Sequence, residues 1–409
     1  MRAHPATRLV LVAVVLALVL RLAFSFLYWN DKPLTQDERE YLALAASLAD
    51  GRGFTYPDDH ETGTGQRFSR APAYPFALAL LGARPSPAAP KRVQAVQAAL
   101  GALTVWLIAS LARRAAGDRA SVIAAFTAAC YPPLVWLPAY VFSEALYMPL
   151  ALGCVLLLDV IAGASASPGR RALALAAVAG TIAGTAALVR SAMLTFLPFA
   201  VVWLARRRRV AVAAILCGAA ALVVAPWTIR NVQTHGRLIV VAADGGVTFW
   251  TGNHPLARGE GDLAANPDLK RAEIAFRRSQ PPMSAEELEP LYYRDAFRHI
   301  AADPLWWGGL VARKLFYTFV PIGPSYTLHS TPYLLATVIP YGLLAPIALI
   351  GAARLVRAGR ATPLLLMALS VVCTALIFFP QERFRIPVID PTVIVCASAV
   401  LAGFGKRRP

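Results

Sequence analysis

The sequence predicts an all-α polytopic membrane protein, a bundle of about ten membrane-spanning helices with two long segments on one side. Three observations predict this fold class. Hydrophobic residues make up 57% of the chain and charged residues only 15%, which is more apolar surface than a water-soluble fold buries. The apolar residues form long runs, and the short connections between them are alternately basic.

Each apolar run is close to the roughly 20 residues that an α-helix needs to cross about 30 Å of hydrocarbon. In order, the runs cover residues 8–29, 91–112, 119–138, 143–164, 171–189, 191–205, 209–226, 331–353, 362–379 and 387–404. The first run is long enough to span, and no small-residue cleavage site follows it, so we expect a retained helix rather than a signal peptide. Arg21 interrupts this run and is expected to pack against other helices or to snorkel.

The positions of Lys and Arg predict the orientation, because basic residues in short loops favour the cytoplasmic side. If the N-terminus is cytoplasmic, every loop on that side is basic: 113–119, 170–171, 206–209, 354–360 and the tail 406–408. Both termini are therefore expected in the cytoplasm. The two long segments, 30–90 and 227–330, are expected on the exterior, periplasmic face of the cytoplasmic membrane.

Composition excludes other classes of protein. The net charge of +17 comes from short clusters between apolar runs and not from one continuous basic face, so we expect membrane lipids and no nucleic acid as partners. The five cysteines are scattered singly without a CxxC spacing, which argues against a disulfide framework or a zinc knuckle.

The long exterior segments contain predicted interfacial helices. In the first, Thr35 and Glu38 have the spacing of a capping box, and a short helix follows until Gly51. The second begins with glycine and polar turn residues, continues with an amphipathic helix over 285–300, and ends with an interfacial helix over 306–320.

Acidic residues at the exterior ends of two spans are the first candidates for chemistry. The capping box gives Glu38 a structural role, and Asp37 would be stabilised by the positive end of the dipole of the same helix. Asp37 is equally placed to act as a general base or to hold a cation. Glu144 follows Ser143, a candidate helix cap, at the start of the fourth span, and an acid just inside an apolar run is costly and often functional. With Asp37 it would form a metal or acceptor site.

Basic residues on the same side are the second group of candidates, with a charge opposite to that of the acids. Arg383 and Arg385 lie in a short exterior loop, against the usual charge bias. Their planar groups suit a phosphate near the lipid headgroups, and the alternative is anchoring to anionic lipid. Arg230 and Lys314 are further exterior cations near the membrane.

Six short motifs together resemble a known family. They are Asp-Glu-Arg-Glu-Tyr at 37–41, Arg-Ala-Pro-Ala-Tyr-Pro-Phe at 70–76, Ser-Glu-Ala-Leu-Tyr at 143–147, Ala-Pro-Trp-Thr-Ile-Arg-Asn at 225–231, Gly-Gly-Val-Thr-Phe-Trp-Thr-Gly-Asn at 245–253 and Glu-Arg-Phe-Arg-Ile-Pro at 382–387. In this order the chain resembles the bacterial GT-C glycosyltransferases related to the dolichyl-phosphate-mannose protein mannosyltransferases. The family often has Arg-Pro-Pro where this chain has Arg-Ala-Pro at 70–72.

The resemblance implies a GT-C-like bundle that transfers a hexose or pentose, with inversion, from a polyprenyl-phosphate carrier to a lipid, glycan or protein acceptor. It implies a catalytic module over 1–226, an exterior region over 227–330 and C-terminal helices over 331–409. For single residues, the resemblance implies that Asp37 is the general base that deprotonates the acceptor hydroxyl, that Glu144 positions the acceptor or a metal, and that Arg383 and Arg385 bind the donor phosphate. Glu38, beside Asp37, is a further catalytic candidate, and the exterior cations Lys314 and Arg230 are further candidates for donor-phosphate binding. A divalent metal at Glu144 is the one cofactor it suggests, and the motifs leave metal dependence open.

Two other functions are compatible with the topology. A secondary transporter would place charged residues near the middle of the bilayer and usually has short loops, whereas the acids of this chain gather at one surface. An O-antigen ligase or polymerase would share the topology and the phosphate-binding arginines. The acid of the first exterior segment favours the mannosyltransferase relatives.

Overall fold

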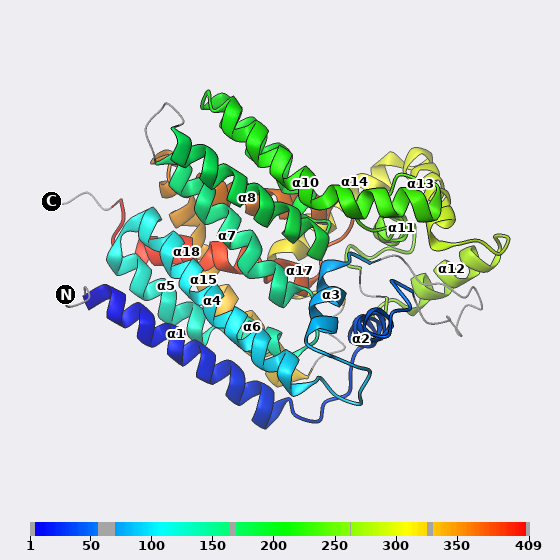
Figure 1. The fold of residues 1–409 in the computed structure, drawn as a ribbon, viewed down its shortest axis with the longest axis horizontal. Coiled ribbons are helices and arrows are strands. Elements are labelled where there is room, and N and C mark those ends of the chain that lie inside the picture. Colours follow the sequence, from blue (N-terminus) through cyan, green and yellow to red (C-terminus); the bar gives the residue numbers. More distant parts are fainter. Residues whose placement is uncertain (1–4, 56–69, 164–168, 262, 325–329, 406–409) are drawn as a thin grey trace.

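The computed structural model describes residues 5–55, 70–163, 169–261, 263–324 and 330–405, which form helices and no strand. Figure 1 shows a bundle of long helices with a smaller group of helices at one end. The helices of the bundle are α1 (Pro5–Ala23) with the π-helix η1 (Phe24–Tyr28), α4 (Lys91–Ala116), α5 (Asp118–Cys130), α6 (Pro132–Trp136) with the 3₁₀ turn η2 (Leu137–Ala139), α7 (Glu144–Ala162), α8 (Arg170–Val189), α9 (Met193–Arg206), α10 (Val210–His235), α15 (Thr331–Arg357), α16 (Thr362–Ile377), α17 (Glu382–Arg385) and α18 (Ile389–Leu401).

All ten apolar runs predicted from the sequence are helical. Six helices of the described chain are long and apolar enough to cross a membrane: α1 with η1, α4, α7, α8, α10 and α15. The third run is a pair of helices, α5 and α6, bent by 62°. Three runs form shorter apolar helices, α9, α16 and α18, of 14, 16 and 13 residues. The chain is therefore a polytopic all-α membrane protein, as predicted.

The bend between α5 and α6 explains why Arg21 is buried in the bundle. Pro132 and Pro133 have no backbone N–H, so the carbonyls of Ala128 and Ala129 lose their helical donors. Arg21 supplies them: its Nη2 donates to Ala128 O at 3.2 Å and its Nη1 to Ala129 O at 3.3 Å. The side chain is 0% exposed, so Arg21 packs between helices and does not snorkel.

The basic loops meet at one end of the bundle. Arg360, after α15, donates to Ala115 O near the end of α4 at 3.3 Å, and Arg209, between α9 and α10, donates to Ile161 O near the end of α7. The start of α1 and the end of α18 lie at this end in Figure 1, and the helices of the two long segments lie at the other. The predicted grouping of the loops on two sides is thus visible in the fold.

The first long segment contains α2 (Gln36–Ala49) and α3 (Ala73–Leu80). The capping box predicted for α2 is confirmed, because Glu38 N donates to Thr35 Oγ1 at 3.4 Å and Thr35 N donates to Glu38 Oε2 at 2.8 Å. The sequence did not indicate α3, which follows Pro72.

The second long segment contains α11 (Gly245–Asn253), α12 (Pro267–Arg278), α13 (Ala285–Ala302) and α14 (Pro304–Phe319). The helices predicted over 285–300 and 306–320 are confirmed. The predicted turn residues at the start of this segment lie over 236–244, between α10 and α11, and the motif at 245–253 forms α11, which the sequence did not indicate. Gly252 serves close packing there and not a turn: a Cβ on it would lie 1.9 Å from Phe378 O. A small apolar core, including Trp250 and Tyr292, holds these helices together.

Candidate active site

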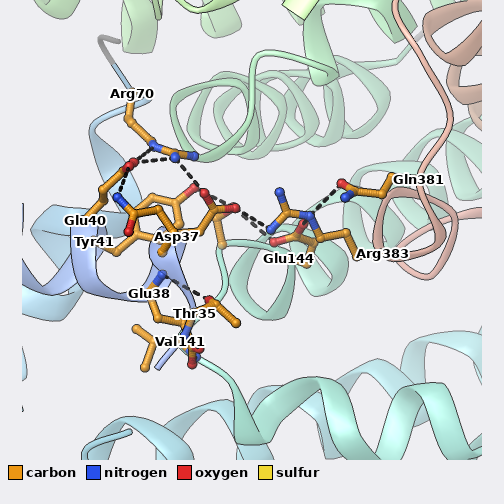
Figure 2. Close-up of polar contacts among 12 residues, drawn as sticks. Thr35, Asp37, Glu38, Glu40, Tyr41, Arg70, Val141, Glu144, Gln381 and Arg383 are labelled. Carbon is orange, nitrogen blue, oxygen red and sulfur yellow. Dashed lines mark hydrogen bonds and ion pairs between the residues drawn. The ribbon is translucent and has the colours of Figure 1, made fainter. Parts of the chain in front are cut away.

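The first turn of α2 places the Asp37 carboxylate between two guanidinium groups. Oδ1 lies 2.8 Å from Arg70 Nη2, and Oδ2 lies 2.5 Å from Arg383 Nη1 (Figure 2). The Asp37 side chain is 21% exposed. Residues that are more than 300 positions apart in the sequence therefore meet at a carboxylate that solvent still reaches.

Arg70 is held in place by α2 itself. Besides Asp37, it forms an ion pair with Glu40, one helical turn further on, and its guanidinium lies 5.2 Å from the ring centre of Tyr41. Asp37, Glu40 and Tyr41 face the same way because residues three or four positions apart share one side of a helix. Arg70 itself precedes α3, which is how the first long segment folds back over α2.

Arg383, from α17, links the acids of two helices. Its Nε donates to Gln381 Oε1 at 2.9 Å and lies 3.9 Å from Glu144 Oε1 (Figure 2). The guanidinium lies 5.3 Å from the ring centre of Phe142. The structure thus brings together Asp37, Glu144 and Arg383, three of the residues that the sequence analysis singled out.

Glu144 begins α7 and is 1% exposed. Its Oε1 lies 2.7 Å from Nη1 of Arg190, a residue of the turn between α8 and α9. Ser143 does not cap α7, contrary to the prediction. Its hydroxyl donates to Glu144 Oε2 at 3.3 Å and accepts from Tyr41 Oη at 3.2 Å and Arg190 Nη1 at 3.1 Å. A serine hydroxyl has one donor and two acceptor positions, and this one uses all three to join α2, α7 and Arg190.

Glu38 lies beside the site but points away from its centre. Oε1 accepts from Val141 N at 2.8 Å, and Oε2 accepts from Thr35 N at 2.8 Å. Burial raises the pKa of Glu38, and the donors Val141 and Thr35 partly offset that rise. Glu38 therefore fastens α2 to the loop that carries Ser143 and Glu144.

Three predicted phosphate ligands lie elsewhere. Arg385 is 4% exposed and lies 2.9 Å from Asp390 of α18. Lys314, of α14, donates to Asn253 Oδ1 at 2.9 Å and Leu376 O at 3.2 Å, and burial lowers its pKa to about 7. Arg230 contacts Asn231, His235 and the ring of Trp227 near the end of α10. None of these described contacts involves Asp37 or Glu144.

The electrostatics of the site leave Asp37 ionised. Burial raises the pKa of Asp37, but the attraction of Arg383 and then Arg70, with their hydrogen bonds, outweighs burial and holds the pKa well below its usual range. Asp244, just before α11, behaves differently: burial raises its pKa, and Arg70 and Arg190 only partly offset that effect. Arg190 thus joins the site through its ion pair with Glu144, although the motifs did not single it out. The one sequence signal for Arg190 is its place in an exterior turn, against the charge bias.

The described residues of this site do not fit a divalent metal. Hard cations take several oxygen ligands, mostly carboxylates and carbonyls. Within the described residues, no three His, Cys, Asp or Glu side chains come together as ligands. Asp37 and Glu144 each face a guanidinium within 3 Å, and Arg383 lies between them.

Comparison with known proteins identifies the fold. No protein-family model and no curated protein sequence matches the chain. The archaeal oligosaccharyltransferase AglB from Archaeoglobus fulgidus, in complex with an inhibitory peptide and a dolichol-phosphate, is 15% identical with a TM-score of 0.55, over 99% of this chain and 52% of its own. The A. fulgidus oligosaccharyltransferase in complex with Zn and sulfate is 14% identical with a TM-score of 0.54, over 96% of this chain and 48% of its own.

The protein O-mannosyltransferase complex Pmt1-Pmt2 of S. cerevisiae, bound to its sugar donor, is 20% identical over 56% of this chain and 34% of its own, with a TM-score of 0.46. This chain spans about half the length of the A. fulgidus enzyme. The likeness to that enzyme extends over nearly the whole of this chain. The chain therefore has the fold of the GT-C glycosyltransferases, which are polytopic membrane proteins.

Proposed function

We propose that the protein is a membrane glycosyltransferase that moves a sugar from a polyprenyl-phosphate carrier to an acceptor hydroxyl at the outer face of the cytoplasmic membrane. The observation that carries this proposal is the Asp37 carboxylate, partly exposed and flanked by Arg70 and Arg383. A base beside two phosphate-binding groups is what transfer from a sugar phosphate requires.

Asp37 would take the proton of the acceptor hydroxyl while the hydroxyl oxygen attacks the anomeric carbon of the donor. The bond from that carbon to the phosphate oxygen breaks, and its electron pair leaves with the polyprenyl phosphate. Attack opposite the leaving group inverts the anomeric centre. Arg383 would stabilise the charge that builds up on the phosphate.

The donor phosphate and Asp37 compete for Arg383. Without donor, both oxygens of Asp37 face guanidinium groups, and a carboxylate so stabilised is a weak base. A phosphate bound to Arg383 would draw that guanidinium away from Oδ2 and make the carboxylate more basic. Binding of the donor would thus prepare the base for the acceptor.

The fold and the charges support the proposed location. The site lies at the end of the bundle opposite the basic loops (Figure 1), and basic loops favour the cytoplasm. A lipid carrier keeps its phosphate at headgroup level, near the ends of the spans. The dolichol-phosphate of the similar A. fulgidus complex supports a lipid phosphate as ligand. The proposed donor is a lipid-linked sugar, and the proposed acceptor is a lipid, a glycan or a protein.

Asp37→Asn is the test of this function. The variant keeps the shape of the side chain but lacks the base, so we expect sugar transfer to fall about a hundredfold or more while the protein still inserts and folds. The measurement is mass analysis of lipid-linked sugars and surface glycans in a deletion strain complemented with each variant. Asp50→Asn, at the end of α2, is the matched control, because Asp50 pairs with the exposed Arg52 and Arg84.

Retained transfer by Asp37→Asn would remove Asp37 from the mechanism. Unchanged glycans and lipid-linked sugars in the deletion strain, together with a loss of solute uptake, would instead identify a transporter.

A further inference from the structure

We infer that Arg190 occupies the position beside Glu144 that a divalent cation would need. The donor phosphate is then bound at this site by guanidinium groups alone. The inference rests on the proposed function. It assigns to Arg190 a role in phosphate binding and to the reaction a site that operates without a divalent metal.

The contacts of Glu144 are the first ground for this inference. Its Oε1 lies 2.7 Å from Arg190 and 3.9 Å from Arg383, and its Oε2 accepts from Ser143 at 3.3 Å. A carboxylate with 1% exposure needs a cationic partner, because an unpaired charge in such a position is strongly unfavourable. Arg190 meets that need within the chain.

Arg190 is fixed in this position by groups on three sides. Its guanidinium contacts Glu144, donates to Ser143 Oγ at 3.1 Å and lies 4.9 Å from the ring centre of Phe384. A divalent cation bound to Glu144 would have to displace a group that is held by an ion pair, a hydrogen bond and a ring. It would also lie next to Arg383, which repels it.

Arg190 and Arg383 are neighbours. Both contact the ring of Phe384, at 4.9 and 5.2 Å, and both approach Glu144 Oε1. The ion pairs of the site join three guanidiniums, from Arg70, Arg190 and Arg383, to three carboxylates, from Asp37, Glu40 and Glu144. Adjacent planar forks form the arrangement that binds phosphate oxygens in pairs, and Arg190 is 21% exposed, so a ligand reaches it.

The experiment measures binding of undecaprenyl phosphate to the purified full chain in phosphatidylcholine nanodiscs. We expect the same Kd with EDTA as with added Mg²⁺, Mn²⁺ or Zn²⁺, and we expect no stoichiometric metal by elemental analysis of the protein. Arg190→Gln is expected to weaken binding about tenfold or more, because it removes a charged hydrogen-bond donor. Arg84→Gln is the matched control, since Arg84 is an exposed arginine near the same end that pairs with Asp50.

Arg190→Gln leaves Glu144 buried without its partner, so a second variant guards against misfolding. The double variant Arg190→Gln/Glu144→Gln replaces the ion pair with two neutral amides of similar shape and is expected to fold and to show the same weakened binding. Arg190→Lys keeps the charge but not the fork, and we expect intermediate affinity.

The outcomes separate this inference from the proposed function. Binding that EDTA abolishes and a divalent metal restores would overturn the inference and leave the function standing. Wild-type affinity in the folded double variant would also overturn it. If the wild-type chain binds no undecaprenyl phosphate under any condition, the proposed lipid-phosphate donor fails and the inference fails with it.

Discussion

Asp37 combines two properties that conflict in the proposed role of catalytic base. It is partly exposed, as a base must be, yet Arg383 and Arg70 hold its pKa below the usual range against the effect of burial. A group of such low pKa gains little by accepting a proton near neutral pH. The conflict disappears if the donor phosphate takes Arg383 away before the acceptor reacts.

This exchange predicts a shift in pH dependence between the free and the donor-bound enzyme. In the free enzyme Asp37 loses its charge only at very low pH, so the acid limb of kcat/KM for the donor should not come from Asp37. In the complex, the proposed loss of Arg383 would raise the pKa of Asp37 toward that of an ordinary carboxyl, so the acid limb of kcat should lie at higher pH. The measurement is a pair of pH profiles, one of kcat/KM from rates at varied donor concentration and one of kcat at saturating donor concentration.

Arg383→Gln provides the control for this prediction. Without Arg383 the pKa of Asp37 is already higher in the free enzyme, so the two acid limbs should move closer together. Coincident limbs in the wild-type chain would contradict the exchange.

The lowered pKa also sets how the stability of the fold depends on pH. Because the folded-state pKa of Asp37 is lowered, its ion pairs stabilise the fold above about pH 4 and lose that contribution as the pH falls further.

At the scale of elements, buried polar side chains position the loop between η2 and α7. Gln94 of α4 donates to Ala139 O at 2.9 Å, and Gln97 donates to Tyr140 O at 2.6 Å. Glu38 accepts from Val141 N. These bonds satisfy the backbone of a non-helical stretch within the bundle, as a membrane environment demands. Ser143 and Glu144 follow directly, so the loop reaches the site in a defined position.

Close packing of α8 on α10 depends on two glycines one turn apart. A Cβ on Gly180 would lie 2.3 Å from Leu216 O, and one on Gly184 would lie 2.7 Å from Ala220 O. Small residues at this spacing let two membrane helices approach closely. The contact places α8, and with it the turn that carries Arg190.

Gly180→Ala should therefore destabilise the protein by about 1–3 kcal/mol, because the added methyl group must push the two helices apart. We expect a lower midpoint in thermal unfolding of the detergent-solubilised chain, followed by tryptophan fluorescence. Gly218→Ala, in α10, is the matched control, since a Cβ there meets nothing within 4 Å. Equal midpoints for the two variants would show that α8 and α10 are not packed as closely as described.

At the scale of the whole molecule, the basic loops and the candidate site lie at opposite ends of the bundle. The loops with Arg209 and Arg360 contact the ends of α7 and α4, whereas Asp37, Glu144 and Arg383 meet at the other end. If the basic loops stay in the cytoplasm, as the general rule for such loops expects, the proposed chemistry would take place on the exterior side.

Labelling of single cysteines tests that orientation. In a chain whose five native cysteines are replaced by alanine, Arg84→Cys at the site end should react with a membrane-impermeant maleimide in intact cells. Arg113→Cys, at the other end and equally exposed, with 55% against 53%, should react only after permeabilisation. The opposite pattern would move the proposed site to the cytoplasm.

The sequence by itself determined the class of fold, the ten apolar helices, the sidedness of the loops and the identity of Asp37, Glu144 and Arg383 as residues of one end. These features follow from local rules: the length of an apolar run, the position of basic residues and the spacing of a cap. Each rule depends only on residues that are close together in the sequence, so it can be applied to one sequence without a structure.

Only the tertiary structure decided which charges meet. Arg385 and Arg383 are two residues apart, yet one pairs with Asp390 in the bundle and the other with Asp37. Arg70 and Arg190 join the site because α2 and the packing of α8 bring them there, and Glu38 leaves it because its oxygens bind backbone amides. The physical reason is that an ion pair depends on distance in space, and the distances between these side chains are set by packing between helices far apart in the sequence.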